Sequence, residues 1–239
     1  MSHSPYLSVV VPTFREADNL KVLIPQLQQV LGAIGRETEI VIVDDFTDDG
    51  TTDLIRGFQA EYGNIELLTR RDERGIASAW IAGLDASRGE VVAIMDADLS
   101  HDPVYVRAMA EHVGDHGLVI GSRYLPGSKS TMPEKSRVAI ALSMIGQKLF
   151  RMFIGLRIYD ASHSLRAFKR ATYEAIRDEL RFDGNVMMME FTYLAQKKGV
   201  GIHEIPMQYK KRGFGETKLN LFTQGLKFLK ALFLIRFYH

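Results

Sequence analysis

Short apolar runs alternate with segments of helical periodicity over the first half of the chain. Runs rich in β-branched residues predict strands, whereas apolar residues spaced three and four apart predict helices. The predicted strands cover residues 7–11, 39–43, 65–69, 91–95 and 117–120, and the predicted helices cover 19–31, 52–62 and 76–87. This βαβα order is typical of an α/β fold with a mostly parallel central sheet flanked by helices.

The second half of the chain is less regular. Its pattern predicts a helix-rich segment at 134–153, helices at 170–180 and 186–199, and a strand at 202–207. The last segment places its polar side chains on one helical stripe and leaves a wide apolar face. These polar residues are Asn220, Thr223, Gln224, Lys227 and Lys230. We therefore expect a main domain over 1–218 and an amphipathic C-terminal helix over 219–239.

Polar side chains cluster where the predicted strands end. The clusters are residues 13–16, Asp44 with Asp45, Arg70 with Arg71, and residues 96–100. Ligands of open parallel sheets bind at the carboxyl ends of the strands. The coincidence of four polar clusters with four strand ends predicts a ligand site at this edge of the sheet.

Composition narrows the class of protein. The 239 residues are 46% hydrophobic and 25% charged, as in folded globular proteins, and they include no cysteine. Disulfides, thiolate metal sites and cysteine nucleophiles are therefore excluded, and the composition fits a reducing cytosolic setting. No signal peptide opens the chain, and no uncharged apolar run approaches the roughly 18 residues that span a bilayer. We expect a chain that does not cross a membrane.

Charge is distributed unevenly along the chain. The formal net charge is +1, yet residues 197–239 contain nine Lys or Arg against Glu204 and Glu216. A basic end on a nearly neutral protein suggests an anionic partner. Phosphate ligands, anionic lipid and nucleic acid all satisfy this requirement, so charge alone does not choose among them.

Two aspartates, Asp96 and Asp98, follow the predicted strand at 91–95. In an extended chain, side chains at positions i and i+2 point to the same side, so these carboxylates could bridge a divalent cation to a diphosphate. Mg²⁺ and Mn²⁺ favour carboxylates, waters and substrate phosphates as ligands. The alternative interpretation is that the aspartates cap the following helix, and both remain open.

A second acidic pair, Asp44 and Asp45, follows the strand at 39–43. A carboxylate in this place could accept hydrogen bonds from a nucleoside base or a ribose hydroxyl. The neighbouring Asp48, Asp49 and Gly50 favour a turn.

No glycine-rich dinucleotide fingerprint and no P-loop is present, so side chains and metal would have to hold any phosphates. The candidate cations are Arg123, Arg137, Arg166, Arg212 and Lys218. Each of them alone is otherwise interpreted as a solvated surface charge. His101 either orients the Asp96–Asp98 loop or is an ordinary loop histidine. Met187–Met189 is interpreted as a core-facing helix segment, and Glu190 is given no catalytic role.

Five motifs in this order closely resemble the dolichol-phosphate mannose synthases and their bacterial polyprenyl-phosphate relatives, of glycosyltransferase family two. They are Val9-Val-Val-Pro-Thr-Phe-Arg-Glu16, Ile42-Val-Asp-Asp-Phe-Thr-Asp-Asp-Gly-Thr51, Met95-Asp-Ala-Asp-Leu-Ser-His101, Gly121-Ser-Arg-Tyr124 and Arg212-Gly-Phe-Gly-Glu-Thr-Lys218. The resemblance runs from about residue 7 to residue 218. It implies a GT-A fold, with a Rossmann-like sheet.

The resemblance also implies ligands and site residues. It implies a GDP-sugar or UDP-sugar donor, a Mg²⁺ or Mn²⁺ ion, and a dolichyl or other polyprenyl phosphate acceptor. Carried over by motif, the nucleoside pocket is Pro12, Phe14, Glu16, Val43 and Asp45, and the metal and diphosphate site is Asp96, Ala97, Asp98 and Ser100. Arg123 and Arg137 would face the acceptor phosphate and the donor, and Arg212 with Lys218 would close over the phosphates.

The implied activity is an inverting transfer of mannose from GDP-mannose to a lipid phosphate, with Asp98, Arg123 and Arg137 in catalysis. We expect a peripheral protein on the cytoplasmic face of a membrane, with no nucleic-acid partner and with a membrane-embedded subunit as a candidate partner. The alternatives are a UDP-glucose-dependent or other UDP-sugar transferase, a transferase with a hydroxyl acceptor, and a non-catalytic nucleotide-binding subunit.

Three departures from the family pattern concern specificity. Arg15 stands where the family usually has Asn, and Ser100 occupies a position that is Gln in some members. The stretch Asp160-Ala-Ser-His-Ser-Leu-Arg166 replaces one usually read as Asp-x-Thr-Ser-Gly-Phe-Arg. This last change leaves sugar and acceptor specificity open.

Overall fold

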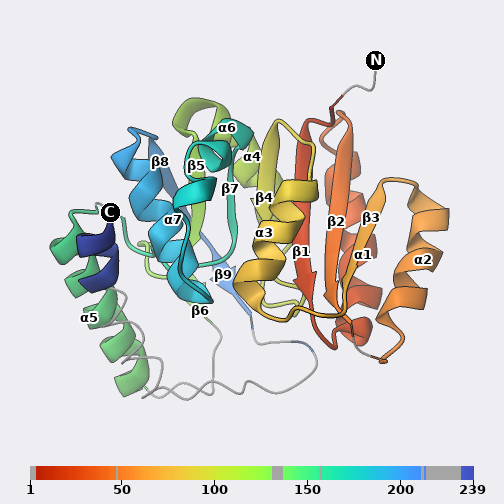
Figure 1. The fold of residues 1–239 in the computed structure, drawn as a ribbon, viewed down its shortest axis with the longest axis horizontal. Helices are drawn as coiled ribbons and strands as arrows, with labels where there is room; N and C mark the ends of the chain where they lie inside the picture. The colour runs from red at the N-terminus through yellow and green to blue at the C-terminus, as the bar shows by residue number, and fades with distance from the viewer. Residues whose placement is uncertain (1–3, 47, 131–136, 157, 211–212, 214–232) are drawn as a thin grey trace.

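The computed structural model describes residues 4–46, 48–130, 137–156, 158–210, 213 and 233–239 (Figure 1). Within these residues, seven strands form one sheet in the order β3 (Ile65–Arg70), β2 (Thr38–Asp45), β1 (Leu7–Thr13), β4 (Val91–Ile94), β7 (Arg166–Lys169), β5 (Leu118–Ser122) and β8 (Ile202–Pro206). β7 is antiparallel to both of its neighbours, and the other pairings are parallel. A small second sheet pairs β6 (Lys129–Ser130) with β9 (Gln208–Tyr209).

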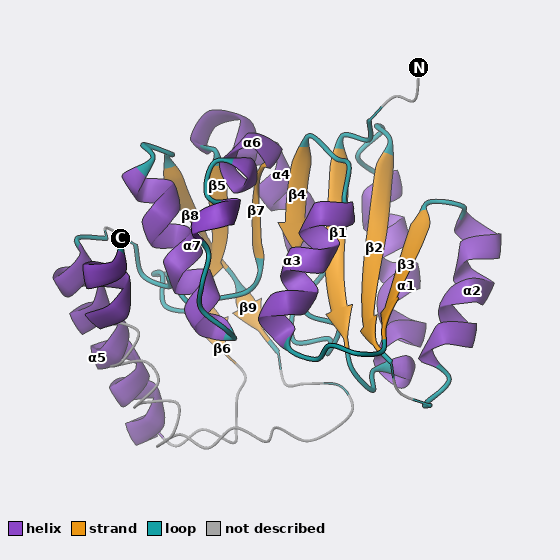
Figure 2. Cartoon of the chain, in the orientation of Figure 1, coloured by secondary structure: helices purple, strands orange, loops and turns teal. Residues whose placement is uncertain are grey.

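Helices cover both faces of the large sheet (Figure 2). One face packs against α1 (Ala17–Gly32), α2 (Thr51–Tyr62) and α4 (Val104–His116). The other packs against α3 (Ile76–Ala86), α6 (Arg170–Glu174) and α7 (Asn185–Lys197). The remaining helix, α5 (Arg137–Ile154), lies at the β8 end of the molecule beside the C-terminal residues.

The central strands contain continuous apolar runs because each strand faces a hydrophobic core on both sides of the sheet. In β1, Val9 and Val11 point into the core beneath α1 and α4, whereas Val10 points into the core beneath α3. Successive side chains of a strand alternate between the two faces, so a strand covered on both sides needs apolar residues at every position. Met187, Met188 and Met189 are buried in the second core, as their pattern predicts.

The predicted strands are all present, and β1 and β2 each extend two residues further than predicted. The prediction of one helix over 170–180 is wrong: α6 ends at Glu174, and a separate 3-10 helix covers Arg177–Glu179. At the break, three hydrogen bonds reach Asp85 of α3: one from the Tyr173 hydroxyl and two from the Arg177 guanidinium. The four-residue strand β7 and the short pair β6–β9 were not predicted.

The end of the chain packs on the domain as far as it is described. Residues 233–238 are helical, Ile235 is buried, and the Phe233 ring meets Phe153 of α5 at 5.6 Å between centroids. The His239 ring lies 2.8 Å from the buried Glu190 carboxylate on α7. Residues 219–232 of the predicted C-terminal helix lie outside the described residues. No helix of the described part is long and apolar enough to cross a membrane.

Glu39 anchors the sheet at the end opposite the polar clusters. Its buried carboxylate accepts hydrogen bonds from the Ser8 hydroxyl at 2.6 Å and from the Arg88 backbone N–H at 2.6 Å. It also accepts two bonds from the Arg88 guanidinium, at 2.9 and 2.6 Å. Burial alone would raise the pKa of Glu39, but these bonds and the Arg88 charge together lower it.

We expect Glu39→Gln to lower the free energy of unfolding at pH 7 by about 2–3 kcal/mol, because four donors lose their charged acceptor. A carboxyl whose pKa is lower in the folded state stabilises above its unfolded pKa, and this contribution is lost as pH falls through the folded value. Urea denaturation should therefore show the gap between wild type and variant closing below pH 4.5, the ordinary pKa of Glu. The exposed Glu37→Gln is the matched control. An equal gap at pH 7 and pH 3 would contradict this prediction.

Candidate active site

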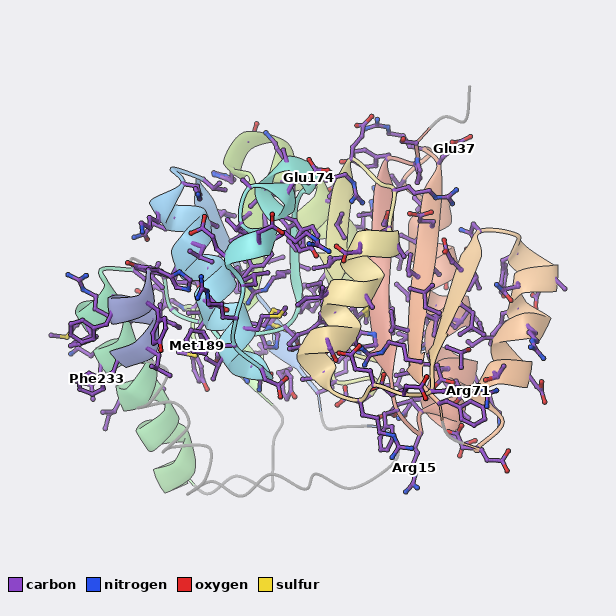
Figure 3. All side chains as sticks on the ribbon, viewed as in Figure 1. Arg15, Glu37, Arg71, Glu174, Met189 and Phe233 are labelled. Carbon is purple, nitrogen blue, oxygen red and sulfur yellow. The ribbon has the colours of Figure 1, made fainter. Side chains whose placement is uncertain are left out.

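The polar clusters meet at one edge of the sheet, because β1, β2, β4 and β5 run parallel and end together. Pro12 and Val43 are neighbours in register on β1 and β2. Figure 3 shows Arg15 and Arg71 at this edge, where the β1 and β2 arrows point, and Glu37 at the opposite edge. The sequence-based prediction that these clusters share an edge is thus confirmed.

The loop after β4 carries Asp96 and Asp98. The Ser164 hydroxyl donates to Asp96 Oδ2 at 2.7 Å, and the Ser100 backbone N–H donates to Asp98 Oδ1 at 3.0 Å. Leu99, between Asp98 and Ser100, has φ of 62°, a left-handed conformation that is uncommon for a residue with a Cβ. The turn at Leu99 keeps both aspartates at the end of β4.

Neither aspartate caps the following helix. α4 begins at Val104, and the Val104 N–H is satisfied by Asp102 Oδ1 at 3.2 Å. No described side chain caps α4, whose N-cap residue is Pro103, so the helix-cap interpretation of Asp96 and Asp98 is wrong. Asp96 and Asp98 lie at the edge of the sheet, directly after β4.

The surroundings of Asp96 leave its negative charge poorly compensated. Burial raises the pKa of this carboxyl most, the neighbouring Asp98 raises it further, and His101, Ser164 and Arg123 oppose the rise. Its Oδ1 atom is buried and accepts no hydrogen bond from the described residues. A divalent cation would compensate this charge, so the pair fits a metal site.

The described residues contain no group of three or more His, Asp or Glu that could hold a metal ion by itself. Within the described residues, water and substrate would supply the remaining ligands of an ion bound by Asp96 and Asp98. Mg²⁺ is commonly bound in this way, by one or two carboxylates together with substrate phosphates.

His101 is not an ordinary loop histidine. It is buried, its Nδ1 accepts the Asp96 backbone N–H at 3.4 Å, and its Nε2 lies 3.2 Å from Nε2 of the buried His163. Burial lowers the pKa of His101, and it lowers the pKa of His163 well below the ordinary value. Two neutral imidazoles thus lie beneath the Asp96 loop, in agreement with the interpretation that His101 orients it.

Arg123, which follows β5, is held by a buried carboxylate. Its Nε donates to Asp160 Oδ2 at 2.7 Å, and a terminal nitrogen donates to Asp160 Oδ1 at 2.9 Å and to the Ser162 hydroxyl at 3.3 Å. Burial opposes the charge of Arg123, but Asp160 raises its pKa overall. The guanidinium is therefore a fixed cation near Asp96, whose pKa it lowers.

Arg166 is not a phosphate ligand. Its side chain is fully buried and donates to backbone carbonyl groups of Ala161, His163 and Met188 and to the Thr192 hydroxyl. Burial lowers its pKa to about 9. The residue ties the 160–165 segment to α7. The prediction that Arg166 is a candidate phosphate ligand is therefore wrong.

The predicted nucleoside residues lie at the ends of β1 and β2. Pro12 and Val43 are buried, whereas the Phe14 ring is 43% exposed and lies beneath the guanidinium groups of Arg15, at 5.5 Å, and Arg74, at 5.7 Å. The Glu16 carboxylate is buried and accepts a hydrogen bond from Asn19. The exposed aromatic face is the part of this group that a nucleoside could contact.

Asp45 is already engaged within the protein. Its carboxylate pairs with the Arg70 guanidinium and accepts the Gly75 backbone N–H at 2.9 Å. These bonds hold the loop between β3 and α3 against the end of β2. A nucleoside hydroxyl would have to share an oxygen with these donors.

The other predicted cations are only partly described. Arg137 is the first residue of α5, but its side chain is not among the described parts of the structure. Arg212 and Lys218 lie outside the described residues. The nearest described residues bind the Asp96–Asp98 loop: the Lys210 N–H donates to the Ser100 carbonyl at 3.0 Å, and the Gly213 N–H donates to the Asp98 carbonyl at 2.9 Å. A Cβ on Gly213 would lie 2.7 Å from Asn19 Oδ1 and 2.8 Å from Leu99 Cδ1, so a larger residue here would have to displace the ends of these two side chains.

Residues 8–177 match the family Glycosyl transferase family 2, which is well over half of the chain. The chain belongs to glycosyltransferase family 2. The undecaprenyl-phosphate mannosyltransferase of Micrococcus luteus is 32% identical over 215 residues, covering 88% of this chain and 86% of that protein. The dolichol-phosphate mannosyltransferase of Saccharomyces cerevisiae is 26% identical over 245 residues, covering 96% and 88%.

The fold of this family 2 glycosyltransferase is also found in solved structures. Glucosyl-3-phosphoglycerate synthase from Mycobacterium tuberculosis, solved with Mn²⁺, UDP and phosphoglyceric acid, matches with a TM-score of 0.69. The match has 16% identity and covers 97% of this chain and 78% of that chain. A complex of the same enzyme with Mn²⁺ and UDP-glucose matches with a TM-score of 0.67, 16% identity, and 97% and 79% coverage. The predicted family and the GT-A fold are confirmed.

Four residues of this family 2 site were missed as functional candidates: Asp160, His163, Ser164 and Arg70. Asp160, His163 and Ser164 stand in the stretch that departs from the family pattern, which was the available signal. Arg70 stands in a strand-end cluster. Their partners are 25 or more residues away in the chain, so no local pattern reveals them.

Proposed function

We propose that this protein transfers mannose from GDP-mannose to a polyprenyl or dolichyl phosphate, with inversion at the sugar and with Mg²⁺ or Mn²⁺. The proposal is supported by two relatives named as mannosyltransferases of undecaprenyl phosphate and dolichol phosphate, which match 88% and 96% of this chain. It is also supported by the site itself, which carries two carboxylates and a fixed guanidinium at one edge of the sheet.

The observation that carries the proposal is that Asp160 and Glu204, on the Arg123 side of the site, are already occupied by other groups. Asp160 is fully buried and bonded twice to Arg123, and Glu204 accepts the backbone N–H groups of Tyr159 and Asp160. Asp96, which also lies near Arg123, is assigned to the metal ion. Neither Asp160 nor Glu204 is available as a general base. A hydroxyl acceptor requires such a base, whereas a phosphate monoester, with a second pKa of about 6, is already ionised at neutral pH.

The reaction is then a single in-line displacement. An oxygen of the acceptor phosphate forms a bond to the anomeric carbon while the bond from that carbon to the diphosphate breaks, and the electron pair leaves with the diphosphate. An α-linked donor would therefore give a β-linked product. The protein has to hold the attacking oxygen about 3–3.5 Å from the anomeric carbon, on the side opposite the leaving group.

Each predicted residue has a role in this scheme. Asp96 and Asp98 would hold the metal ion, which neutralises charge on the leaving diphosphate when it is bound. Ala97 and Ser100 would line the same loop, and Phe14, with Pro12, Glu16, Val43 and Asp45, would surround the nucleoside. Arg123 and Arg137 would align the acceptor phosphate. Arg212 and Lys218 would close over the phosphates.

The test is an assay of sugar transfer from labelled donors. GDP-mannose, UDP-glucose and UDP-mannose are each combined with polyprenyl phosphate, with the corresponding free polyprenol, and with no acceptor, with and without EDTA. Transfer from GDP-mannose to the phosphate alone, abolished by EDTA and restored by Mn²⁺, is expected. Transfer to the free alcohol would refute the assignment of a phosphate acceptor. Full activity in EDTA would refute the assignment of a metal ion. Preference for UDP-glucose would establish the alternative donor.

A membrane-facing surface would bring the site to its lipid acceptor. α5 exposes Met144, Ile145, Leu149 and Met152 on one side, and the adjacent C-terminal turn exposes Phe233, Phe237 and Tyr238. Figure 3 shows Phe233 on the outer side of the molecule beside α5. Lys148 and Arg151 lie among the apolar residues near Tyr124, the neighbour of Arg123. Such a mixture of apolar and basic side chains suits the surface of an anionic membrane.

We therefore extend the proposal to peripheral attachment at the cytoplasmic face of a membrane, through α5 and the segment 219–239 following a 1–218 catalytic domain. Leu149→Glu with Met152→Glu is expected to abolish co-flotation with vesicles that contain anionic lipid. Val22→Glu, a change at a similarly exposed apolar residue of α1, should leave flotation intact. Equal flotation of all three proteins would contradict attachment through α5.

A further inference from the structure

The segment before β7 lies beneath the Asp96 carboxylate because of strand register. β7 is antiparallel to β4, with Ile94 opposite Arg166. Continuing this register by two residues in each direction brings Ser164 opposite Asp96, and the Ser164 hydroxyl donates to Asp96 Oδ2 at 2.7 Å. The contact thus follows from backbone pairing as well as from the rotamers of two side chains.

Within the described part of the chain, the Ser164 hydroxyl is the side-chain group that donates a hydrogen bond to the Asp96 carboxylate. His101 Nε2 lies 3.9 Å from Oδ2, which is beyond hydrogen-bond distance, and Oδ1 accepts no hydrogen bond there. Ser164 is itself only 5% exposed, so water does not compete freely for its hydroxyl.

The buried histidine pair supports the backbone of the same aspartate. His101 Nδ1 accepts the Asp96 N–H, so a neutral His101 carries its proton on Nε2, directed at His163 Nε2 at 3.2 Å. His163 is the residue immediately before Ser164, and the two rings meet edge to face at 4.8 Å between centroids. The 163–164 segment therefore contacts Asp96 twice, directly through Ser164 and indirectly through His101.

We infer that Ser164 is a positioning residue that sets the orientation of the Asp96 carboxylate for metal binding, with His163 and His101 supporting the backbone of that aspartate. This inference rests on the proposed role of Asp96 as a metal ligand. The terminal torsion of an aspartate is soft, so an unsupported carboxylate turns readily. A hydrogen bond from Ser164 occupies one lone pair of Oδ2 and leaves the others for a cation. Groups that orient ligating carboxylates in this way tune the affinity of the metal.

The test measures binding of Mn²⁺ by electron paramagnetic resonance, with GDP and separately with UDP present, so that it does not depend on turnover. Ser164→Ala and Ser164→Gly are each expected to raise the Mn²⁺ dissociation constant about tenfold or more. His163→Ser is expected to raise it as well, but less, because the hydroxyl of Ser164 remains. The matched control is Ser87→Ala, which removes another buried serine hydroxyl, at the opposite end of the sheet.

Thermal unfolding of each variant shows whether it is folded, and two Ser164 variants of different volume guard against a packing defect in one of them. If folded Ser164→Ala and Ser164→Gly bind Mn²⁺ as wild type does, Ser164 has only a structural role and the inference is overturned. If wild type itself binds no Mn²⁺ with either nucleotide, the metal part of the proposed function fails, and the inference fails with it. Weakened binding in Ser87→Ala equal to that of the Ser164 variants would also overturn it.

Discussion

Asp98→Asn is expected to lower kcat/KM for sugar transfer by about a thousandfold, the upper range for removal of one preorganised electrostatic group in an active site. The amide is a much weaker ligand of Mg²⁺ or Mn²⁺ than the carboxylate, and charge on the departing diphosphate would be less well neutralised. An asparagine oxygen can still accept the Ser100 N–H, which Asp98 Oδ1 accepts at 3.0 Å. The loop should therefore keep its shape, and the loss should be in catalysis.

Steady-state rates with GDP-mannose and polyprenyl phosphate at several Mn²⁺ concentrations measure this effect. Asp102→Asn is the matched control, since Asp102 belongs to the same loop and accepts the Val104 N–H, which an asparagine oxygen can still accept. It should keep activity within a few-fold of wild type, because this hydrogen bond is retained. An Asp98→Asn protein with full activity would remove Asp98 from the mechanism.

Asp160→Asn is expected to lower the free energy of unfolding by about 3–5 kcal/mol, because it leaves the Arg123 guanidinium buried without its countercharge. The Asp160 side chain is fully buried and the Arg123 side chain only 17% exposed, so water cannot replace the lost partner. Activity should fall too, because Arg123 loses the two bonds that fix its orientation. Chemical denaturation at pH 7 measures the first effect, and transfer assays on the folded fraction measure the second.

Two comparisons make the Asp160 prediction specific. Asp18→Asn breaks an exposed pair with Lys21, whose side chains are 68% and 59% exposed, and such a pair contributes at most about 1 kcal/mol. The double variant Arg123→Met, Asp160→Asn removes both charges, so it should recover much of the stability but none of the activity. Recovery of activity in the double variant would show that Arg123 is not needed to align the acceptor.

Together these variants separate two halves of the proposed reaction. In the proposed reaction, Asp98 would act on the leaving diphosphate, at the end of β4, and Arg123 would act on the incoming phosphate, at the end of β5. β7 lies between these strands, and its preceding segment contacts both halves, through Ser164 to Asp96 and through Asp160 to Arg123. The 160–165 segment is held in turn by the buried Arg166. Its departure from the family pattern therefore falls on residues that contact both Asp96 and Arg123.

The sequence determined the local elements and the edge of the sheet where the site lies. Strands covered on both faces must be apolar throughout, so β1, β2 and β4 are visible as continuous runs, and polar residues at their ends mark the edge. The ordered motifs determined the family. β7 escaped prediction because four residues are too short for a periodic pattern, and the break between α6 and the 3-10 helix depends on bonds to Asp85 on another helix.

Only the tertiary structure decided which charges are available to a ligand. Arg123 and Arg166 are alike as sequence letters, yet one lies at the site beside Asp160 and the other is buried among carbonyl groups. Asp96 and Asp102 are both loop aspartates, yet one accepts a bond from Ser164 and the other from the Val104 N–H at the start of α4. Asp160, the partner of Arg123, and Ser164, the partner of Asp96, lie 37 and 68 positions away in the chain and are brought to them by strand order. The local sequence shows which type of side chain is present. Its pKa, its orientation and its hydrogen-bond partners depend on the residues that the fold places beside it.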